Sequence, residues 1–233
     1  MATFLQMTQK VARESGTIAG VQPAAVTGQT GRNLKVVNWV ADAWEEIQND
    51  RESWLWMRKE YLDESVTVSV LNTVRYTPAS WNLTDHSRWV TEKDSLTMYL
   101  VSTGVSDEGE LNYIPWSDFR KIYLRGTQTA SRPRDYSVSP ANEICIGPKP
   151  DAVYAFAGEY YQGNQTLAAN TTAANCPARF HDVIVWKALQ KLAASDEAVD
   201  LMNYATSMYE PLRKALERDQ LPEMNIAGTA TLA

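Results

Sequence analysis

The first apolar residues of the chain recur at helical spacing between residues 3 and 15. They are Phe4, Leu5, Val11 and Ala12. Thr3 is a favourable N-cap, because its hydroxyl can accept a hydrogen bond from a backbone N–H of the first turn. Gly16 can end the helix, since glycine adopts the left-handed conformation without strain. We therefore predict a short helix here, followed by a turn-rich stretch, GTIAGVQPAAVTGQTG.

A second helical pattern begins at about Arg32 and continues into the fifties. Its apolar stripe is Val36, Val40, Trp44, Ile47 and Trp54, with Trp39 and Ala43 at its edges. Trp44 and Trp54 fall within the stripe, so we expect both in the core. Trp56 would face the opposite side of a continuing helix. Either the helix ends before Trp56, or this ring contacts something outside the chain.

Between about residues 62 and 163 the apolar period becomes two, which is typical of half-buried strands. The alternating residues are Val66, Val68 and Val70, then Leu96, Met98 and Leu100, then Ile144 and Ile146, then Tyr154, Phe156 and Tyr160. The sequence GPKPD at 147–151 favours a turn between the last two strands. The polar SDEGE at 106–110 favours a hairpin tip. We predict an antiparallel sheet or a small sandwich.

Helical spacing returns after Pro177, a residue that suits the first turn of a helix. From Phe180 to Leu192 the apolar residues occupy most of the circumference, so this helix needs cover on several sides. Ser195 and Asp196 interrupt the pattern and can cap the next helix.

The last helical pattern has an apolar stripe of Val199, Met202, Tyr209, Leu212 and Leu216. Pro211 lies inside it and predicts a kink or a break near Tyr209, because proline lacks the N–H that a helix interior requires. The tail after Pro222, EMNIAGTATLA, has no regular period. We expect it to be an extended arm.

These patterns predict an α+β fold. Its helices, from both ends of the chain, form one antiparallel helical bundle with an inserted antiparallel β-sheet or small β-sandwich. The expected boundaries are 1–61 for the N-terminal helices, 62–174 for the inserted β domain, 175–221 for the C-terminal helices and 222–233 for the arm.

Composition and charge exclude several classes of protein. The chain has 233 residues, 44% of them hydrophobic, which is enough for a substantial core. Its net charge is -6 and it has no run of Lys and Arg, so sequence-independent nucleic-acid binding is not expected. It contains neither a signal-peptide pattern nor an apolar run long enough to span a membrane. Cys145 and Cys176 lack metal-ligand spacing, and two reduced thiols are the simpler interpretation, although a disulfide stays open.

The residues that could carry catalysis lack the required spacing. His181 and Asp182 are adjacent and would point about 100° apart on a helix, so the carboxylate cannot orient the imidazole. His86 follows Asp85 in an expected loop, without a second spaced ligand for a metal. No nucleotide-binding or hydrolase motif occurs. Gly28 to Gly31 precede a helix and could bind an anion, but a flexible turn is the simpler interpretation. We expect no catalytic residue, no metal and no cofactor.

An ordered set of segments resembles the adaptor, or head-completion, proteins of the tailed-phage neck. The segments are VTGQTGRNLKVVNWVADAWEEIQNDRESWLWMR, YIPWSDFRKIYL, RPRDYSV, IGPKPDAVYAFAGEYY and PARFHDVIVWKALQKLA. The resemblance extends from about Leu5 to Pro222. The set and its order carry it, because no one segment is diagnostic alone.

The resemblance implies a structural role without catalysis. In that family the helical part forms a ring, usually of twelve subunits, beneath the portal protein. The C-terminal segment reaches the portal, the β region faces a downstream neck or tail protein, and genomic DNA passes without sequence-specific binding. This places the chain in the virion, at the junction of head and tail, with no membrane. The candidate subunit or portal contacts are Trp56, Phe180, Trp186, Leu189, Met224 and Ile226.

Two other functions remain open from the residues alone. A carbohydrate-binding β module could use exposed rings such as Trp81, Trp89 and Trp116. A hydrolase could use His86 or His181. The first would bind saccharide as a monomer, and the second would lose turnover when both histidines are replaced.

Overall fold

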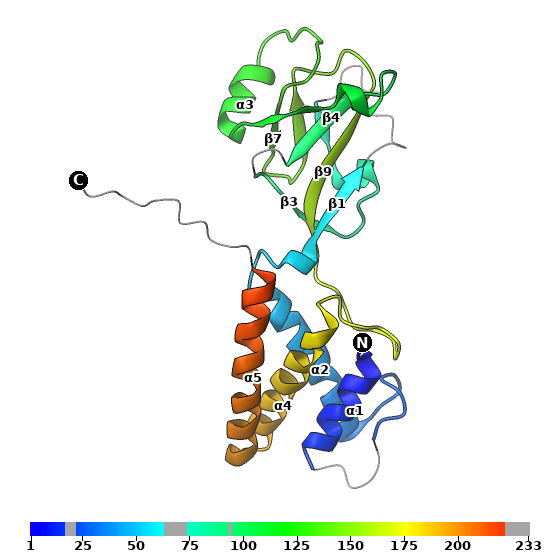
Figure 1. Ribbon diagram of the computed structural model, residues 1–233, viewed down its shortest axis with the longest axis vertical. Coiled ribbons are helices and arrows are strands. Elements are labelled where there is room, and N and C mark those ends of the chain that lie inside the picture. Colours follow the sequence, from blue (N-terminus) through cyan, green and yellow to red (C-terminus); the bar gives the residue numbers. More distant parts are fainter. Residues whose placement is uncertain (17–21, 63–73, 93–94, 222–233) are drawn as a thin grey trace, which may run out of the picture. The chain divides into compact units, whose positions relative to one another are not determined.

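A computed structural model describes residues 1–16, 22–62, 74–92 and 95–221. The chain divides into two compact units, one made of residues 1–57 and 164–233 and the other of residues 58–163 (Figure 1). The expected strand with Val66, Val68 and Val70, and the expected arm after Pro222, lie outside the described residues. The α+β class is confirmed, with helices in both units and two sheets in the second.

The first unit is helical. Its elements are α1 (Phe4–Glu14), α2 (Gly31–Asn49), α4 (His181–Ser195) and α5 (Val199–Gln220), with 3-10 turns at Leu55–Met57 and Ala178–Phe180. The capping of α1 is as predicted. Thr3 accepts a hydrogen bond from the N–H of Gln6, and the Gln6 side chain accepts one from the N–H of Thr3. Gly16 follows in the left-handed conformation, with φ of 61°.

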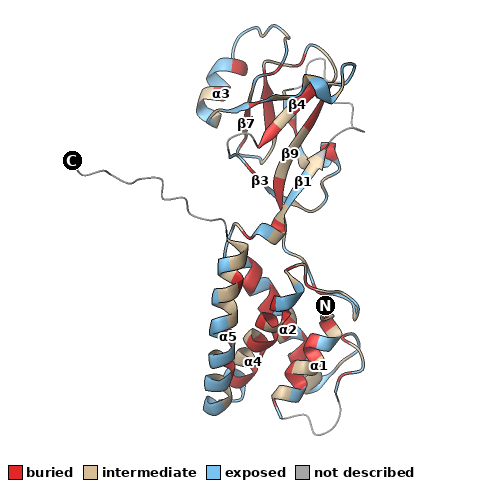
Figure 2. Cartoon of the chain, viewed as in Figure 1, coloured by how far each residue is buried: buried red, intermediate tan, exposed pale blue. Residues whose placement is uncertain are grey.

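Helix α4 lies at the centre of this unit and contacts α1, α2 and α5 (Figure 2). This explains why its apolar residues surround the helix: three other helices of the same chain cover it. Four of its apolar residues are at most 1% exposed: Val183, Ile184, Ala188 and Leu192. The predicted need for cover on several sides is therefore met inside one chain.

Helix α5 differs from its prediction at both Pro211 and its first turn. The prediction near Tyr209 was a kink or a break, and the break is wrong, because the helix continues through Pro211 as one element. Pro211 has no N–H to donate to the carbonyl of Ser207, four residues earlier. Ser207 is exposed, so water can bond to this carbonyl instead. Asp196 does not cap α5; it forms an ion pair with Arg32 of α2. Val199 is 68% exposed and is not part of the buried stripe.

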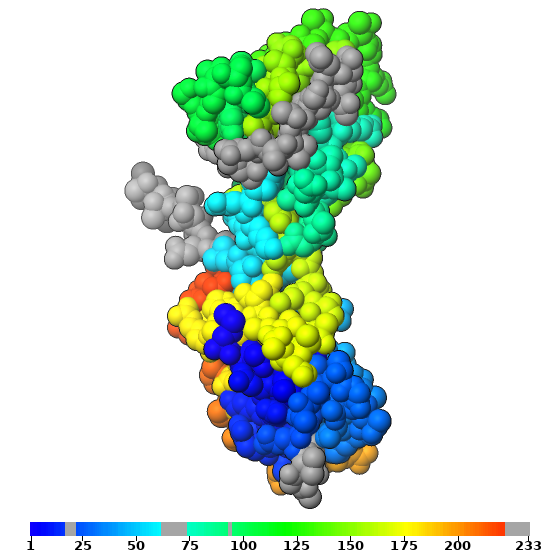
Figure 3. All heavy atoms as spheres, turned by 90° about the vertical axis from the view of Figure 1, so that its right-hand side faces the viewer, coloured from blue at the N-terminus to red at the C-terminus, as the bar shows by residue number. Residues whose placement is uncertain are grey.

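The segment after the inserted unit belongs with the helices, although the sequence placed residues up to 174 with the strands. The N–H of Phe4 donates to Thr172 O over 2.7 Å, and the N–H of Val26 donates to Asn170 Oδ1 over 2.7 Å. Figure 3 shows this yellow segment against the dark blue N-terminal residues. The boundary moves because these polar loop residues bond to the backbone of the N-terminal segments.

The described part of the second unit contains nine strands in two sheets. The five-stranded sheet comprises β1 (Arg58–Leu62), β3 (His86–Trp89), β4 (Leu96–Leu100), β5 (Gly109–Glu110) and β9 (Tyr154–Gln162). The four-stranded sheet comprises β2 (Arg75–Tyr76), β6 (Asn112–Tyr113), β7 (Asp135–Val138) and β8 (Ile144–Gly147). Pairing is antiparallel except between β6 and β7, which is parallel. The predicted strands around Leu96, Ile144 and Tyr154 are confirmed.

A shared apolar core lies between the two sheets. Leu96 and Met98 of β4 and Phe156 of β9 pack in one cluster with Ile144 and Ile146 of β8. Because side chains alternate along a strand, the remaining residues of these strands face outward. The unit is thus a small sandwich, one of the two forms predicted.

The β region also contains helix α3 (Trp116–Tyr123), which was not predicted from the sequence. It packs on the outer face of the four-stranded sheet, where Phe119 and Tyr123 contact the outward-facing Cys145. Gly147 makes this possible, since a Cβ there would lie 2.6 Å from the Tyr123 ring. Trp116, Phe119 and Tyr123 have helical spacing, but the helix has only 8 residues, which is too short for the period to stand out between strands.

Candidate functional site

The tryptophan-rich stretch lies where α2 ends and the chain leaves the helical unit. Helix α2 stops at Asn49, so the expected continuation into the fifties is wrong. The chain turns through Asp50 to Ser53 and enters the 3-10 turn Leu55–Met57. Trp54 is 1% exposed, as predicted, but it reaches the core from this turn and not from the helix. Its Nε1 donates to Ile47 O over 3.0 Å.

Three indole rings form a stack at this point. The ring centroids of Trp54 and Trp56 are 4.3 Å apart and their planes differ by 22°. The centroids of Trp44 and Trp56 are 6.2 Å apart. Trp56 is half-buried between the two core rings. Of the two alternatives left open for Trp56, the end of the helix before it is the one observed.

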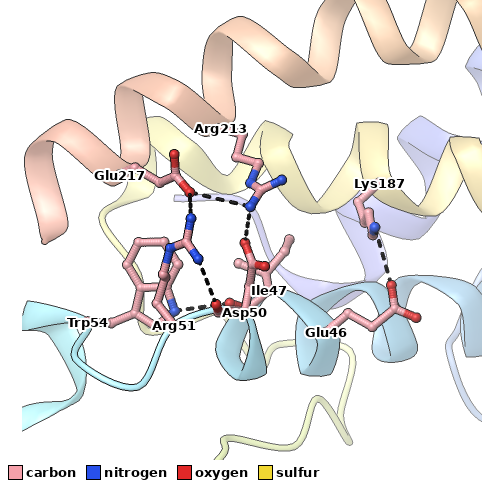
Figure 4. A network of polar contacts seen from close by, with 8 residues as sticks. All are labelled: Glu46, Ile47, Asp50, Arg51, Trp54, Lys187, Arg213 and Glu217. Carbon is pink, nitrogen blue, oxygen red and sulfur yellow. Dashed lines mark hydrogen bonds and ion pairs between the residues drawn. The ribbon is translucent and has the colours of Figure 1, made fainter.

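An ion-pair network ties the end of α2 to α5 (Figure 4). Arg213 of α5 donates to Asp50 Oδ2 over 2.6 Å and lies 3.4 Å from Glu217 Oε1. Arg51 donates to the same Glu217 oxygen over 2.9 Å. Burial opposes the charge of Arg213, but the carboxylates of Asp50 and Glu217 and the field of Tyr209 outweigh it and raise the arginine pKa.

The chain returns from the sandwich beside the point where it left. The N–H of Gln165 donates to Gln48 Oε1 over 2.7 Å, and Gln48 Nε2 donates to Gln165 O over 3.1 Å. Asn164 Nδ2 donates to Asn49 Oδ1 over 2.7 Å. Gln48 is 2% exposed, so its two bonds to Gln165 are largely shielded from water, whereas the bond between Asn164 and Asn49 is exposed. Both crossings of the chain are therefore fixed to the last turn of α2.

Sequence reasoning missed the polar residues that hold this junction. Only the position of Gln48 could have been noticed in the sequence. It follows Ile47 at the edge of the apolar stripe, where a buried polar side chain needs a hydrogen-bond partner. Arg213 and Glu217 give none, since their partners are more than 160 residues away in the sequence.

Three of the six expected interface residues are buried within the chain. Phe180, Trp186 and Leu189 are 6%, 4% and 0% exposed, because the other helices of the same chain cover them. Trp56 belongs to the indole stack. Met224 and Ile226 lie outside the described residues.

Comparison with known families decides the class of the protein. A family model described as the SU10 adaptor protein matches residues 2–230. The chain belongs to the SU10 adaptor protein family. The resemblance read from the sequence is thereby confirmed, and membership points to a structural, non-enzymatic phage protein. No individually curated protein matches the chain.

His181 of this adaptor has structural partners. His181 is 2% exposed, its Nδ1 accepts from the N–H of Ala2 over 3.1 Å, and its Nε2 lies 3.3 Å from Cys176 O. Asp182 pairs with Lys10 over 2.8 Å and not with the histidine. His181 therefore has a hydrogen-bonding role at the start of α4.

The aromatic rings proposed for a carbohydrate platform lie mainly inside the sandwich of the adaptor. Trp81 and Trp89 are 5% and 3% exposed and pack edge-to-face with centroids 5.1 Å apart. Trp116 is half-buried against Phe119. A flat, exposed row of rings is therefore not present among these three residues.

The thiols of the adaptor are free and buried. Burial raises the pKa of Cys145 to about 11 and that of Cys176 to about 12, so neither is a thiolate at neutral pH. In the described ranges, no group of three or more His, Cys, Asp or Glu side chains is placed to hold a metal ion. Across the same ranges, no helix combines the length and apolarity that crossing a membrane requires.

Proposed function

We propose that this adaptor forms a ring beneath the portal of a phage, extends the DNA channel and joins the head to the tail. The observation that carries the proposal is the family match, which covers residues 2–230 of a 233-residue chain. A match of this extent includes both units, so the proposed role belongs to the whole chain and not to one module.

The two-unit organisation supports a connecting role. Each unit has its own core, and the residues around Gln48 and Trp54 fix both chain crossings to the helical unit. A protein that joins two assemblies needs two separate surfaces, and two independently packed units supply them. We propose that α1, α2, α4 and α5 form an antiparallel bundle that faces the portal, with the sandwich toward the tail.

The proposed portal contact is the segment 222–233, for reasons of sequence. It lacks the period of a helix or strand and contains Met224 and Ile226, which can bury apolar surface on a partner. Trp56 stays in the proposal as a contact near the junction. Phe180, Trp186 and Leu189 support the contact indirectly, as the packed interior of the helical unit.

The net charge of -6 fits a conduit through which DNA passes. A strongly basic lumen would retain phosphates through counterion release and slow the passage of DNA. We expect duplex DNA to show no saturable binding to the isolated protein at physiological salt.

The portal contact can be tested with purified components. The adaptor is mixed with portal rings and imaged by electron microscopy, and a protein that ends at Leu221 serves as the comparison. We expect an added ring of density with the full chain and none with the shortened one, while both give the same circular dichroism spectrum. Absence of the added ring with the full chain contradicts the neck role, and its presence with the shortened chain contradicts the role of the arm.

A further inference from the structure

A groove hollows the outer face of the five-stranded sheet. Its volume is about 730 Å³, and it is lined by outward-facing residues of β1, β4 and β9 and by the turn between β4 and β5. The charged lining residues are Arg58, Glu60, Glu108 and Glu159. Val105, on the wall of the groove, is 59% exposed. The groove thus combines an apolar wall with an excess of carboxylates.

Two of these carboxylates oppose each other. Glu60 and Glu159 are direct partners in the register of β1 and β9 and point to the same face. Arg58 Nε donates to Glu159 Oε2 over 2.7 Å, whereas the Glu60 side chain has no ion-pair partner among the described residues. Like charges directly opposite on adjacent strands destabilise a sheet. Arg58 offsets the charge of Glu159, so the carboxylate that a cation from outside the groove would neutralise is that of Glu60.

The opposite face of the sandwich has complementary properties. Helix α3 lies on the outer face of the four-stranded sheet and exposes Arg120, Lys121 and Ile122, with Arg125 just beyond its end. Ile122 is 51% exposed. Among the described residues Lys121 pairs with Asp118, one turn away on the same helix, and an exposed pair of this kind contributes little. Residues 112–150 contain six basic and three acidic residues, in a chain with an acidic excess.

The two surfaces cannot meet within one molecule, because the sandwich core separates them. The groove involves Glu60 and Thr97, which point away from the core on one sheet, and α3 covers Cys145, which points away from it on the other. Complementary patches on opposite faces join copies head to tail. Such a contact repeats and gives a ring when the rotation between copies closes.

We propose that α3 of one copy docks in the groove of the next copy. Arg120, Lys121 and Arg125 then face Glu60 and Glu108, and Ile122 packs near Val105. This inference rests on the proposed function, and it adds a contact between the sandwiches of neighbouring copies to the ring that the resemblance assigns to the helical part. A polyanion such as DNA is the other partner that α3 could attract, but it would leave the carboxylates of the groove unmatched.

Charge reversal tests the contact. One variant carries Arg120→Glu and Lys121→Glu, and a second carries Glu60→Lys and Glu108→Lys. Each variant alone brings like charges together, so we expect copy-to-copy assembly to be lost. An equimolar mixture restores attraction at every contact, and we expect assembly to return, with the two variants alternating. The control reverses Asp42 and Glu45 to lysine on the exposed face of α2, and we expect it to assemble like the wild type.

The readout is the mass of the particles by native mass spectrometry, measured with and without portal, and circular dichroism checks that each variant folds. Wild-type binding to portal tests the neck role separately. Wild-type rings on portal, together with rings of either variant alone, contradict the docking inference but leave the neck role intact. A mixture of the two variants that stays unassembled also contradicts the inference. So does a third outcome, in which the wild type binds DNA and the variant with Arg120→Glu and Lys121→Glu loses that binding but assembles normally.

A cross-link locates the contact independently of charge. Protein with Ile122→Cys is mixed with protein carrying Val105→Cys and treated with a short bismaleimide. The native thiols are buried and do not compete. We expect covalent dimers only when both variants are present. Their absence from assembled rings overturns the assignment of α3 to the groove.

Discussion

The indole rings of Trp54 and Trp56 stack with their centroids 4.3 Å apart, two residues from each other in the sequence. Trp54 is fully buried, whereas Trp56 is half-buried. We expect Trp54→Ala to destabilise the helical unit by about 3–5 kcal/mol, the range for removing a buried indole. Trp56→Ala should cost less, about 1–2 kcal/mol, because less apolar area is lost. Urea unfolding followed by far-ultraviolet circular dichroism measures both, and equal losses would contradict the difference in burial.

The side chain of Gln48 holds the returning chain through two hydrogen bonds to Gln165. Gln48→Leu keeps the size of the residue but removes both partners from the backbone of Gln165. A buried group without a partner costs about 1–3 kcal/mol. We expect faster hydrogen exchange at residues 164–167 and a lower melting temperature. Gln9→Leu is the matched control, because Gln9 is half-buried and, among the described residues, its side chain donates to Pro23 O. If hydrogen exchange at residues 164–167 is unchanged in Gln48→Leu, the two bonds of Gln48 do not hold this segment.

His86 makes the sandwich sensitive to acid. Burial lowers the pKa of His86 to about 4, against a smaller opposing effect of Asp85. Below pH 6.5 His86 is protonated in the unfolded chain but stays neutral in the folded chain until about pH 4. The free energy of unfolding therefore falls as the pH is lowered from about 6.5 to about 4. The His86 ring packs against Trp89, with centroids 4.1 Å apart and planes that differ by 49°, and we expect His86→Phe to keep this packing.

The measurement for His86 is the free energy of unfolding of the two proteins across that pH range. We expect the wild type to lose stability toward acid and His86→Phe to lose much less. Burial raises the pKa of Asp85, but hydrogen bonds from Lys59 and Tyr160 outweigh burial and lower it. Any loss of stability that comes from protonation of Asp85 therefore occurs at lower pH. Parallel curves for the two proteins between pH 6.5 and pH 4 would show that His86 is not the group responsible.

Gly147 sets the distance between α3 and the sheet. A methyl group there would lie 2.6 Å from the ring of Tyr123, which is too close for any carbon atom. We expect Gly147→Ala to displace α3, to lower the stability of the sandwich by about 1–3 kcal/mol, as overpacking does, and to weaken assembly through α3. Gly109→Ala is the control, because its nearest neighbour is the end of the Arg132 side chain at 3.6 Å. Equal melting temperatures for the two variants would contradict the close contact.

Much of the fold could be predicted from periodicity and capping. The α1 helix, with Thr3 as its cap, and the strands around Leu96 and Ile144 follow from neighbouring residues, which decide such elements locally. The burial of Trp44 was predicted from the same pattern. The end of α2 at Asn49 was not, because the apolar stripe happens to continue in phase to Trp54 after the helix has stopped.

The sequence by itself determined the α+β class, the positions of most helices and strands, and the family, because these depend on local period and on the order of segments. Only the tertiary structure decided what covers α4, how Trp56 is held, and that Arg213 and Gln48 fix the junction. Those features depend on contacts between residues more than a hundred positions apart or on the end of a helix. The placement of α3 and the acidic groove on opposite faces of one sandwich belongs to the same group, since it follows from strand pairing and not from any local pattern.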